Sequence, residues 1–156
     1  MIFERLNAMT QQLPPKNLVL YADDDIDDID LIRDAFRHYP SVEIVDFENG
    51  EALLHYAQHL ASVDVTPCLI ILDVNMPRMD GKSTLRALRS MESYQHTPVI
   101  LYTTSTLPDE KAFARKFNAG FVTKPLCVDQ IRKAVDLFVD QCSEDVRRAI
   151  KKESKK

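Results

Sequence analysis

Two apolar segments of this sequence each lead directly into acidic residues, and this pattern is the first indication of chemistry. Residues 69–72 lead into Asp73, and residues 18–22 lead into three consecutive aspartates at residues 23–25. A buried strand that ends in an unpaired charge is costly, so Asp73 indicates either a tight hydrogen-bond network or a reactive site. If the two segments are parallel strands, their carboxylates meet at one edge of a sheet.

More polar residues are expected at the same edge. Hydroxyl side chains at residues 103–105 follow a predicted strand at residues 99–102, and Lys124 follows a short one at residues 121–123. Carboxylates suit a hard divalent cation such as Mg²⁺, whereas a hydroxyl and an ammonium suit the oxygens of a phosphoryl group. Because a carboxylate can itself attack phosphorus, the set indicates phosphoryl transfer.

The elements that must position these residues alternate along the chain as strand and helix. Five apolar segments are predicted to be strands: residues 18–22, 42–47, 69–72, 99–102 and 121–123. The predicted helices span about residues 27–38 and begin after Asn49-Gly50, after Gly81, at Pro108 and near Val128. Alternation of this kind predicts an α/β fold around a parallel sheet.

Composition restricts the class of protein. The 156 residues favour one domain, and 45% hydrophobic with 28% charged residues is ordinary for a globular protein. No apolar run approaches the roughly 18 residues of a membrane span, so no membrane insertion is expected. The three cysteines form no CxxC pair, which predicts reduced thiols and a cytoplasmic location. The net charge of −4 argues against direct nucleic-acid binding.

Extensions are predicted on both sides of the domain. Residues 1–17 form an N-terminal extension, residues 18–141 the domain, and residues 142–156 a basic C-terminal extension. Because Cys142, Val146 and Ile150 follow the apolar face of the last helix in steps of four, we expect that helix to continue through the extension. A homodimer through this long helix is therefore a hypothesis.

Together, the motifs resemble the receiver domain of two-component response regulators over residues 18–141. They are the acidic residues after the first strand, the loop at residues 72–77 with Asp80-Gly81, the hydroxyl after the fourth strand, Phe121, and Lys124-Pro125. Each motif is weak alone, but all five occur in the order and spacing of that family. The resemblance implies a flavodoxin-like, doubly wound, five-stranded parallel sheet in the order 2-1-3-4-5, with helices on both faces.

The resemblance also implies roles for the acidic residues. Asp73 corresponds to the phosphoacceptor, and the Mg²⁺ ligands are Asp23, Asp24, Asp73 and the backbone carbonyl of Asn75. Asp25 is a third candidate for the acidic pair, but the first two aspartates follow the strand most closely, as the pair of the family does. The other acidic residues of this stretch are interpreted as helix-start or solvent residues: Asp27, Asp28 and Asp30.

The remaining motifs correspond to the catalytic and switch positions of the family. Thr103 and Lys124 are the expected catalytic contacts to the phosphoryl oxygens, with Thr103 preferred over Thr104 by its distance from the preceding strand. Thr103 and Phe121 form the expected switch pair, in which the aromatic ring turns inward. The Lys124–Pro125 peptide bond is expected to be cis.

The resemblance implies a switch rather than an enzyme that acts on external substrates. The expected phosphoryl donor is a sensor histidine kinase or a histidine phosphotransfer protein. The extension after residue 141 is too short to fold as an effector domain. The expected output of a stand-alone, single-domain regulator is therefore binding of a downstream effector protein or relay of the phosphoryl group.

Two alternatives belong to other functional classes. A phosphohydrolase of the haloacid-dehalogenase type also uses a strand-end aspartate, but it needs a second aspartate as general acid where this sequence has Asn75. The other alternative is a scaffold that binds partners without being phosphorylated. Such a scaffold is expected to have lost part of its acidic site, whereas this sequence retains every motif.

Overall fold

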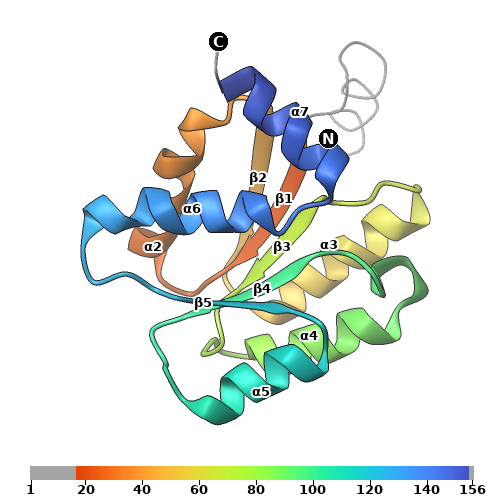
Figure 1. Ribbon diagram of the computed structural model, residues 1–156. Coiled ribbons are helices and arrows are strands. Elements are labelled where there is room, and N and C mark those ends of the chain that lie inside the picture. The colour runs from red at the N-terminus through yellow and green to blue at the C-terminus, as the bar shows by residue number, and fades with distance from the viewer. Residues whose placement is uncertain (1–16, 155–156) are drawn as a thin grey trace.

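A computed structural model describes residues 17–154, so most of the predicted N-terminal extension lies outside the described residues. The strands are β1 (Asn17–Ala22), β2 (Val42–Phe47), β3 (Leu69–Leu72), β4 (Val99–Thr103) and β5 (Gly120–Thr123). All neighbours pair in parallel, in the order β2-β1-β3-β4-β5. The predicted α/β sheet and its strand order are therefore confirmed (Figure 1).

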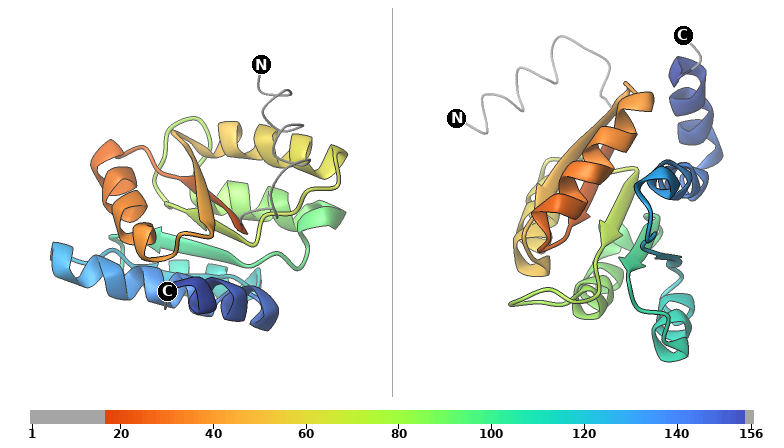
Figure 2. Two further views of the ribbon diagram at one scale, coloured as in Figure 1. Left: turned by 90° about the horizontal axis from the view of Figure 1, so that it is seen from above. Right: turned by 90° about the vertical axis from the view of Figure 1, so that its left-hand side faces the viewer.

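The helices cover both faces of this sheet, as predicted (Figure 2). They are α2 (Ile26–Ala35), α3 (Gly50–Ser62), α4 (Gly81–Ser90), α5 (Pro108–Lys116), α6 (Ile131–Asp140) and α7 (Glu144–Ser154). Short 3₁₀ turns lie at Phe36–His38, Glu92–Tyr94 and Val128–Gln130. No helix among the described residues is both long and apolar enough to cross a membrane.

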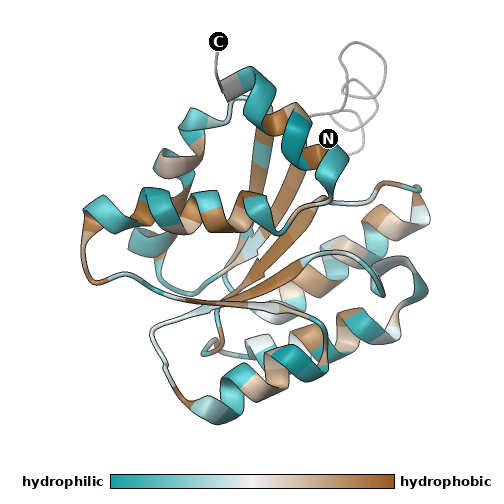
Figure 3. Ribbon diagram, viewed as in Figure 1, coloured by the Kyte–Doolittle hydropathy of each residue, from teal (hydrophilic) through white to brown (hydrophobic). Residues whose placement is uncertain are grey.

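The alternation of strand side chains produces two apolar cores, one on each face of the sheet. Val19, Tyr21 and Ile71 face the core beneath α2, α6 and α7, whereas Leu20 and Ile70 face the core beneath α3, α4 and α5. All four residues of β3 are buried, which is typical of the central strand of a parallel sheet. Apolar residues accordingly concentrate in the strands and polar residues on the outer helix surfaces (Figure 3).

The prediction that the last helix continues through residues 142–156 is wrong. Helix α6 ends at Asp140, the chain turns, and α7 is a separate helix running in a different direction (Figure 1). The turn lets Cys142, Val146 and Ile150 pack against the core beneath α2 and α6, with Ile150 only 1% exposed. A straight continuation would leave these side chains in water, so burial favours the turn. They therefore present no apolar face to a second copy.

The predicted cis bond at Lys124–Pro125 is also wrong, because the described residues contain no cis peptide bond. The trans isomer is the preferred state of an X-Pro bond, by about 0.5–1 kcal/mol. The backbone of Lys124 is positioned from β4, since its amide donates to the carbonyl of Thr103 at 2.7 Å.

The packing of α7 can be tested by substitution. Ile150→Ala should lower the free energy of unfolding by about 2 to 4 kcal/mol, because it removes buried methyl groups and leaves a cavity. Lys152→Ala, at an exposed position of the same helix, should change it by less than about 0.5 kcal/mol. Urea unfolding of both variants measures the difference; equal stabilities would contradict the packing of α7 on the core.

Candidate functional site

The carboxyl ends of β1 and β3 bring two buried aspartates to the same edge of the sheet. Asp73 follows β3 and its amide donates to the carbonyl of Ala22, the last residue of β1, at 2.9 Å. Asp23 follows β1 and its amide donates to the carbonyl of Phe47 in β2 at 3.0 Å. Continued ladder hydrogen bonds thus place both carboxylates just past the ends of adjacent strands.

Asp23, Asp24 and Asp73 form a cluster that could hold a metal ion. One carboxylate oxygen from each lies within 4.8 Å of the others, and Asp24 is exposed whereas the other two are buried. Three oxygen donors with one side open to water fit a hard divalent cation that keeps several waters. Asn75, two residues after Asp73, is exposed on the loop that leads to α4.

Asp23 is held by a network of its own. It is fully buried, its Oδ2 accepts from the Tyr21 hydroxyl at 2.6 Å, and its Oδ1 accepts from the Asp25 amide at 3.0 Å. Burial, followed by the charge of Asp23, raises the pKa of Tyr21, so the hydroxyl stays protonated and remains a donor. The orientation of Asp23 is thereby fixed from both sides.

Lys124 supplies the positive charge of the site. Its Nζ lies 2.8 Å from Asp23 Oδ2, 2.7 Å from Asp28 Oδ2 and 3.6 Å from Asp73 Oδ2. Burial by itself lowers the pKa of Lys124, but the hydrogen bonds to Asp23 and Asp28 outweigh it and the net shift is upward. The side chain therefore carries an ammonium, which faces the Tyr102 ring with Nζ 5.6 Å from its centroid.

Asp73 has a strongly shifted proton affinity. Burial and the negative charge of Asp23 raise its pKa to about 7, against the partial opposition of Lys124. A carboxyl group with this pKa binds a proton near neutral pH unless further positive charge is present. A cation among the three aspartates would favour the charged, nucleophilic form.

The loop after Asp73 is fixed by close backbone packing. The Gly81 amide donates to the carbonyl of Val74 at 2.9 Å, and a Cβ on Gly81 would lie 2.2 Å from the carbonyl oxygen of Asp73. Asp80 caps α4 by accepting from the Ser83 amide at 2.7 Å. The glycine is therefore needed for α4 to start directly against the residue that bears the site carboxylate.

The two predicted switch residues lie on β4 and β5. Thr103 is fully buried at the end of β4, and its hydroxyl accepts from the amide of Ser105 at 3.2 Å. Phe121 is half-buried against the core beneath α3, α4 and α5, and the ammonium of Lys111 lies 5.8 Å from its ring centroid. Thr104 is exposed, so Thr103, rather than its neighbour, is the buried hydroxyl at the carboxyl edge of the sheet.

Sequence reasoning missed two members of the site. Asp28 lies in the first turn of α2, as interpreted, but it also contacts Lys124, and the hydroxyl of Tyr21 donates to Asp23. The strand period of two offers a signal for Tyr21, because residues 21 and 23 point to the same side where the extended backbone continues past β1. Asp28 lies in the first turn of α2 among several aspartates, and only the position of Lys124 distinguishes it from them.

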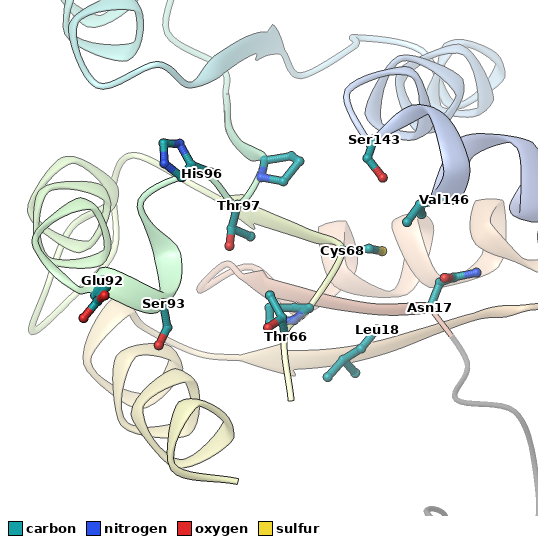
Figure 4. Close-up of a pocket in the computed structure, with 12 residues that line it drawn as sticks. Asn17, Leu18, Thr66, Cys68, Glu92, Ser93, His96, Thr97, Ser143 and Val146 are labelled. Carbon is teal, nitrogen blue, oxygen red and sulfur yellow. The ribbon is translucent and has the colours of Figure 1, made fainter. Parts of the chain in front are cut away.

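A cavity of about 500 Å³ lies away from these residues, at the opposite, amino-terminal edge of the sheet. It lies between the start of α7 and the segments that precede β3 and β4, and Cys68, Thr97 and Ser143 are among its lining residues (Figure 4). The predicted site residues do not line this cavity, so the predicted site and the cavity lie at different edges of the sheet.

Curated proteins of similar sequence match parts of this chain. The probable methanogenesis regulatory protein FilR2 of Methanothrix harundinacea is 29% identical over 91 residues, covering 56% of this chain and 58% of that protein. The chain spans between 31% and 58% of the length of the first three curated relatives that it matches, two of which are protein-glutamate methylesterase/protein-glutamine glutaminases.

Solved structures show the same fold. The phosphorylated cyanobacterial phytochrome response regulator RcpA aligns with a TM-score of 0.73 at 21% identity, covering 81% of this chain and 96% of that one. The Mn²⁺-bound form of response regulator Rcp1 aligns with a TM-score of 0.69 at 23% identity, covering 76% and 88%. The response regulator receiver domain family matches residues 19–136. With this match over most of its length, the chain belongs to the response regulator receiver domain family.

Proposed function

We propose that this chain accepts a phosphoryl group on Asp73 from a phosphohistidine of a sensor histidine kinase or a histidine phosphotransfer protein. The observation that carries the proposal is the meeting of a buried, partly desolvated carboxylate with two further aspartates and one ammonium at the carboxyl edge of a parallel sheet. Phosphoryl transfer needs this combination of a positioned nucleophile and charge stabilisation.

In the proposed reaction, a carboxylate oxygen of Asp73 forms a bond to phosphorus. The N–P bond of the donor phosphohistidine breaks, and the imidazole leaves with the bonding electron pair and takes up a proton. The ammonium of Lys124, 3.6 Å from Asp73, is placed to approach a phosphoryl oxygen, and the hydroxyl of Thr103 offers a donor from the next strand. The aspartyl phosphate is later hydrolysed or passed on.

A divalent cation, which we propose to be Mg²⁺, belongs to this site. Asp23, Asp24 and Asp73 would hold it, together with the backbone carbonyl of Asn75 and waters, and Rcp1 has been crystallised with Mn²⁺. When bound, Mg²⁺ supplies charge neutralisation between the aspartates and the transferred group. Asp23 is preset for this role because the Tyr21 hydroxyl and the Asp25 amide already orient its two oxygens.

The proposed output is a change in protein binding or a relay of the phosphoryl group. Thr103 would exchange its contact with the Ser105 amide for a phosphoryl oxygen, and Phe121 would turn inward on β5. Such a change favours one of two pre-existing states, and a downstream effector protein would bind one of them better. A homodimer would need a surface other than the apolar side of α7, which is buried.

The proposed role is that of a switch in the cytoplasm that modifies only itself. Repeated hydrolysis of an external phosphate ester needs a general acid near Asp73, and the phosphohydrolase alternative places it at Asn75, an amide that cannot transfer a proton in that role. The scaffold alternative gains no support from the site, because the acidic cluster and Lys124 are both present and in contact.

The acceptor can be identified by intact mass. After incubation with Mg²⁺ and acetyl phosphate, the wild type should gain about 80 Da, the mass of one phosphoryl group, and Asp73→Asn should gain nothing. Asp30→Asn, which removes an exposed carboxylate of α2, serves as a control and should gain the same mass as the wild type. No gain of mass in the wild type, together with no binding of beryllofluoride and Mg²⁺ in a parallel sample, would point to the scaffold alternative.

Metal affinity should depend on pH through Asp73. Because the pKa of Asp73 is about 7, the proton is bound at pH 6 and absent at pH 8, and a cation must displace it. The Mg²⁺ dissociation constant should therefore rise about tenfold from pH 8 to pH 6, and much less in Asp73→Asn. Calorimetric titrations at both pH values measure the change; identical constants in the wild type would contradict the shifted pKa.

A further inference from the structure

Lys124 shares its ammonium among three carboxylates, and one of them has no part in the proposed transfer. Asp28 extends from the first turn of α2 and lies 2.7 Å from Nζ of Lys124. It is not a member of the three-aspartate cluster that could hold a metal ion. One of the two hydrogen bonds of the Lys124 ammonium is therefore to a group outside the metal cluster.

The ammonium of Lys124 lies at different distances from its three carboxylate partners. An ammonium has three N–H donors. Asp23 and Asp28 accept hydrogen bonds from it at 2.8 and 2.7 Å, whereas the oxygen of Asp73 lies at 3.6 Å, beyond the reach of a good hydrogen bond. In this arrangement the cation is drawn toward Asp23 and Asp28 and held off the carboxylate that would receive the phosphoryl group.

We propose that Asp28 is a positioning residue that holds the ammonium of Lys124 in a resting position. To contact a phosphoryl group on Asp73, the ammonium must leave Asp28. The inference rests on the proposed function. It predicts that the contact between Lys124 and Asp28 opposes the phosphorylated state, so that Asp28 sets how readily the domain enters that state and how long it stays there.

Asp28 suits this role better than Asp23. Both oxygens of Asp23 are already engaged by the Tyr21 hydroxyl and the Asp25 amide, and a bound cation would take up part of its charge. The side chain of Asp28 is 30% exposed, whereas that of Asp23 is fully buried. Water can therefore replace Lys124 as the partner of Asp28 when the ammonium moves, which makes this contact the one that can open.

The test is the affinity for beryllofluoride, a stable stand-in for the phosphoryl group, in the presence of Mg²⁺. Asp28→Asn should bind it about fivefold more tightly than the wild type, because the ammonium is released from a charged partner. Loss of any nearby negative charge also strengthens the binding of an anion such as beryllofluoride, so Asp27→Asn is the matched control. Asp27 lies in the same turn of α2, is exposed, and is not a partner of Lys124 in the contacts described above.

A double-mutant cycle with Lys124 separates the positioning effect of Asp28 from the general effect of removing a negative charge and from a folding defect. In a Lys124→Gln background, Asp28→Asn should change beryllofluoride affinity no more than Asp27→Asn does, because the ammonium is absent. The half-life of the phosphoryl group, measured after acetyl phosphate is removed, should lengthen in Asp28→Asn on the wild-type background only. A defect limited to folding would alter neither quantity in this Lys124-dependent way.

The outcomes separate this inference from the function on which it rests. If the wild type binds neither beryllofluoride nor a phosphoryl group, both the proposed function and the inference are overturned. If the wild type binds beryllofluoride and a phosphoryl group, but Asp28→Asn and Asp27→Asn have the same affinity for beryllofluoride, the proposed function stands and the positioning role is wrong. Weaker binding by Asp28→Asn would likewise overturn the inference, because Asp28 would then support the phosphorylated state.

Discussion

The ammonium of Lys124 makes it possible for carboxylates to gather at a buried edge of this sheet. Asp23 and Asp73 are both buried, and two like charges there repel each other and lose hydration. Lys124 lies against both of them and against Asp28, so one cation partly offsets three anions. The offset is incomplete, so burial, together with the negative charge that remains, raises the pKa of Asp73 to about 7. That remainder attracts a cation, which would turn Asp73 into a charged nucleophile.

The rest of the fold can be understood as the support for this balance. The order β2-β1-β3-β4-β5 places the strand ends that carry Asp23 and Asp73 side by side, and β5 supplies Lys124 from the sheet edge. Two apolar cores pack against the two faces of the sheet. The close approach of Gly81 to the carbonyl of Asp73 fixes the loop between β3 and α4. The site is therefore preorganised by backbone packing, whereas the ammonium is positioned by side-chain contacts with Asp23 and Asp28.

The sequence was sufficient for the features that depend on local pattern. Mainly apolar strands, turn glycines and acidic strand ends predicted the sheet, its edge site and the acidic cluster. The features that it missed depend on long-range packing. Whether Ile150 lies on a continued helix or folds back depends on the core beneath α2 and α6, whose strand residues, such as Val19 and Ile71, lie far from it in the sequence. Likewise, Asp28 is one of several similar aspartates until Lys124 is placed beside it.

The most direct test of this electrostatic account is a carboxyl ¹³C NMR titration of the metal-free protein, with Asp73 assigned by comparison with Asp73→Asn. The account predicts that Asp73 titrates at a pH of about 7, and that its titration moves to lower pH when Mg²⁺ is added. It further predicts a higher midpoint in Lys124→Gln, because the offsetting charge is gone. A midpoint at the ordinary value near 4, unchanged by metal or by loss of Lys124, would contradict it.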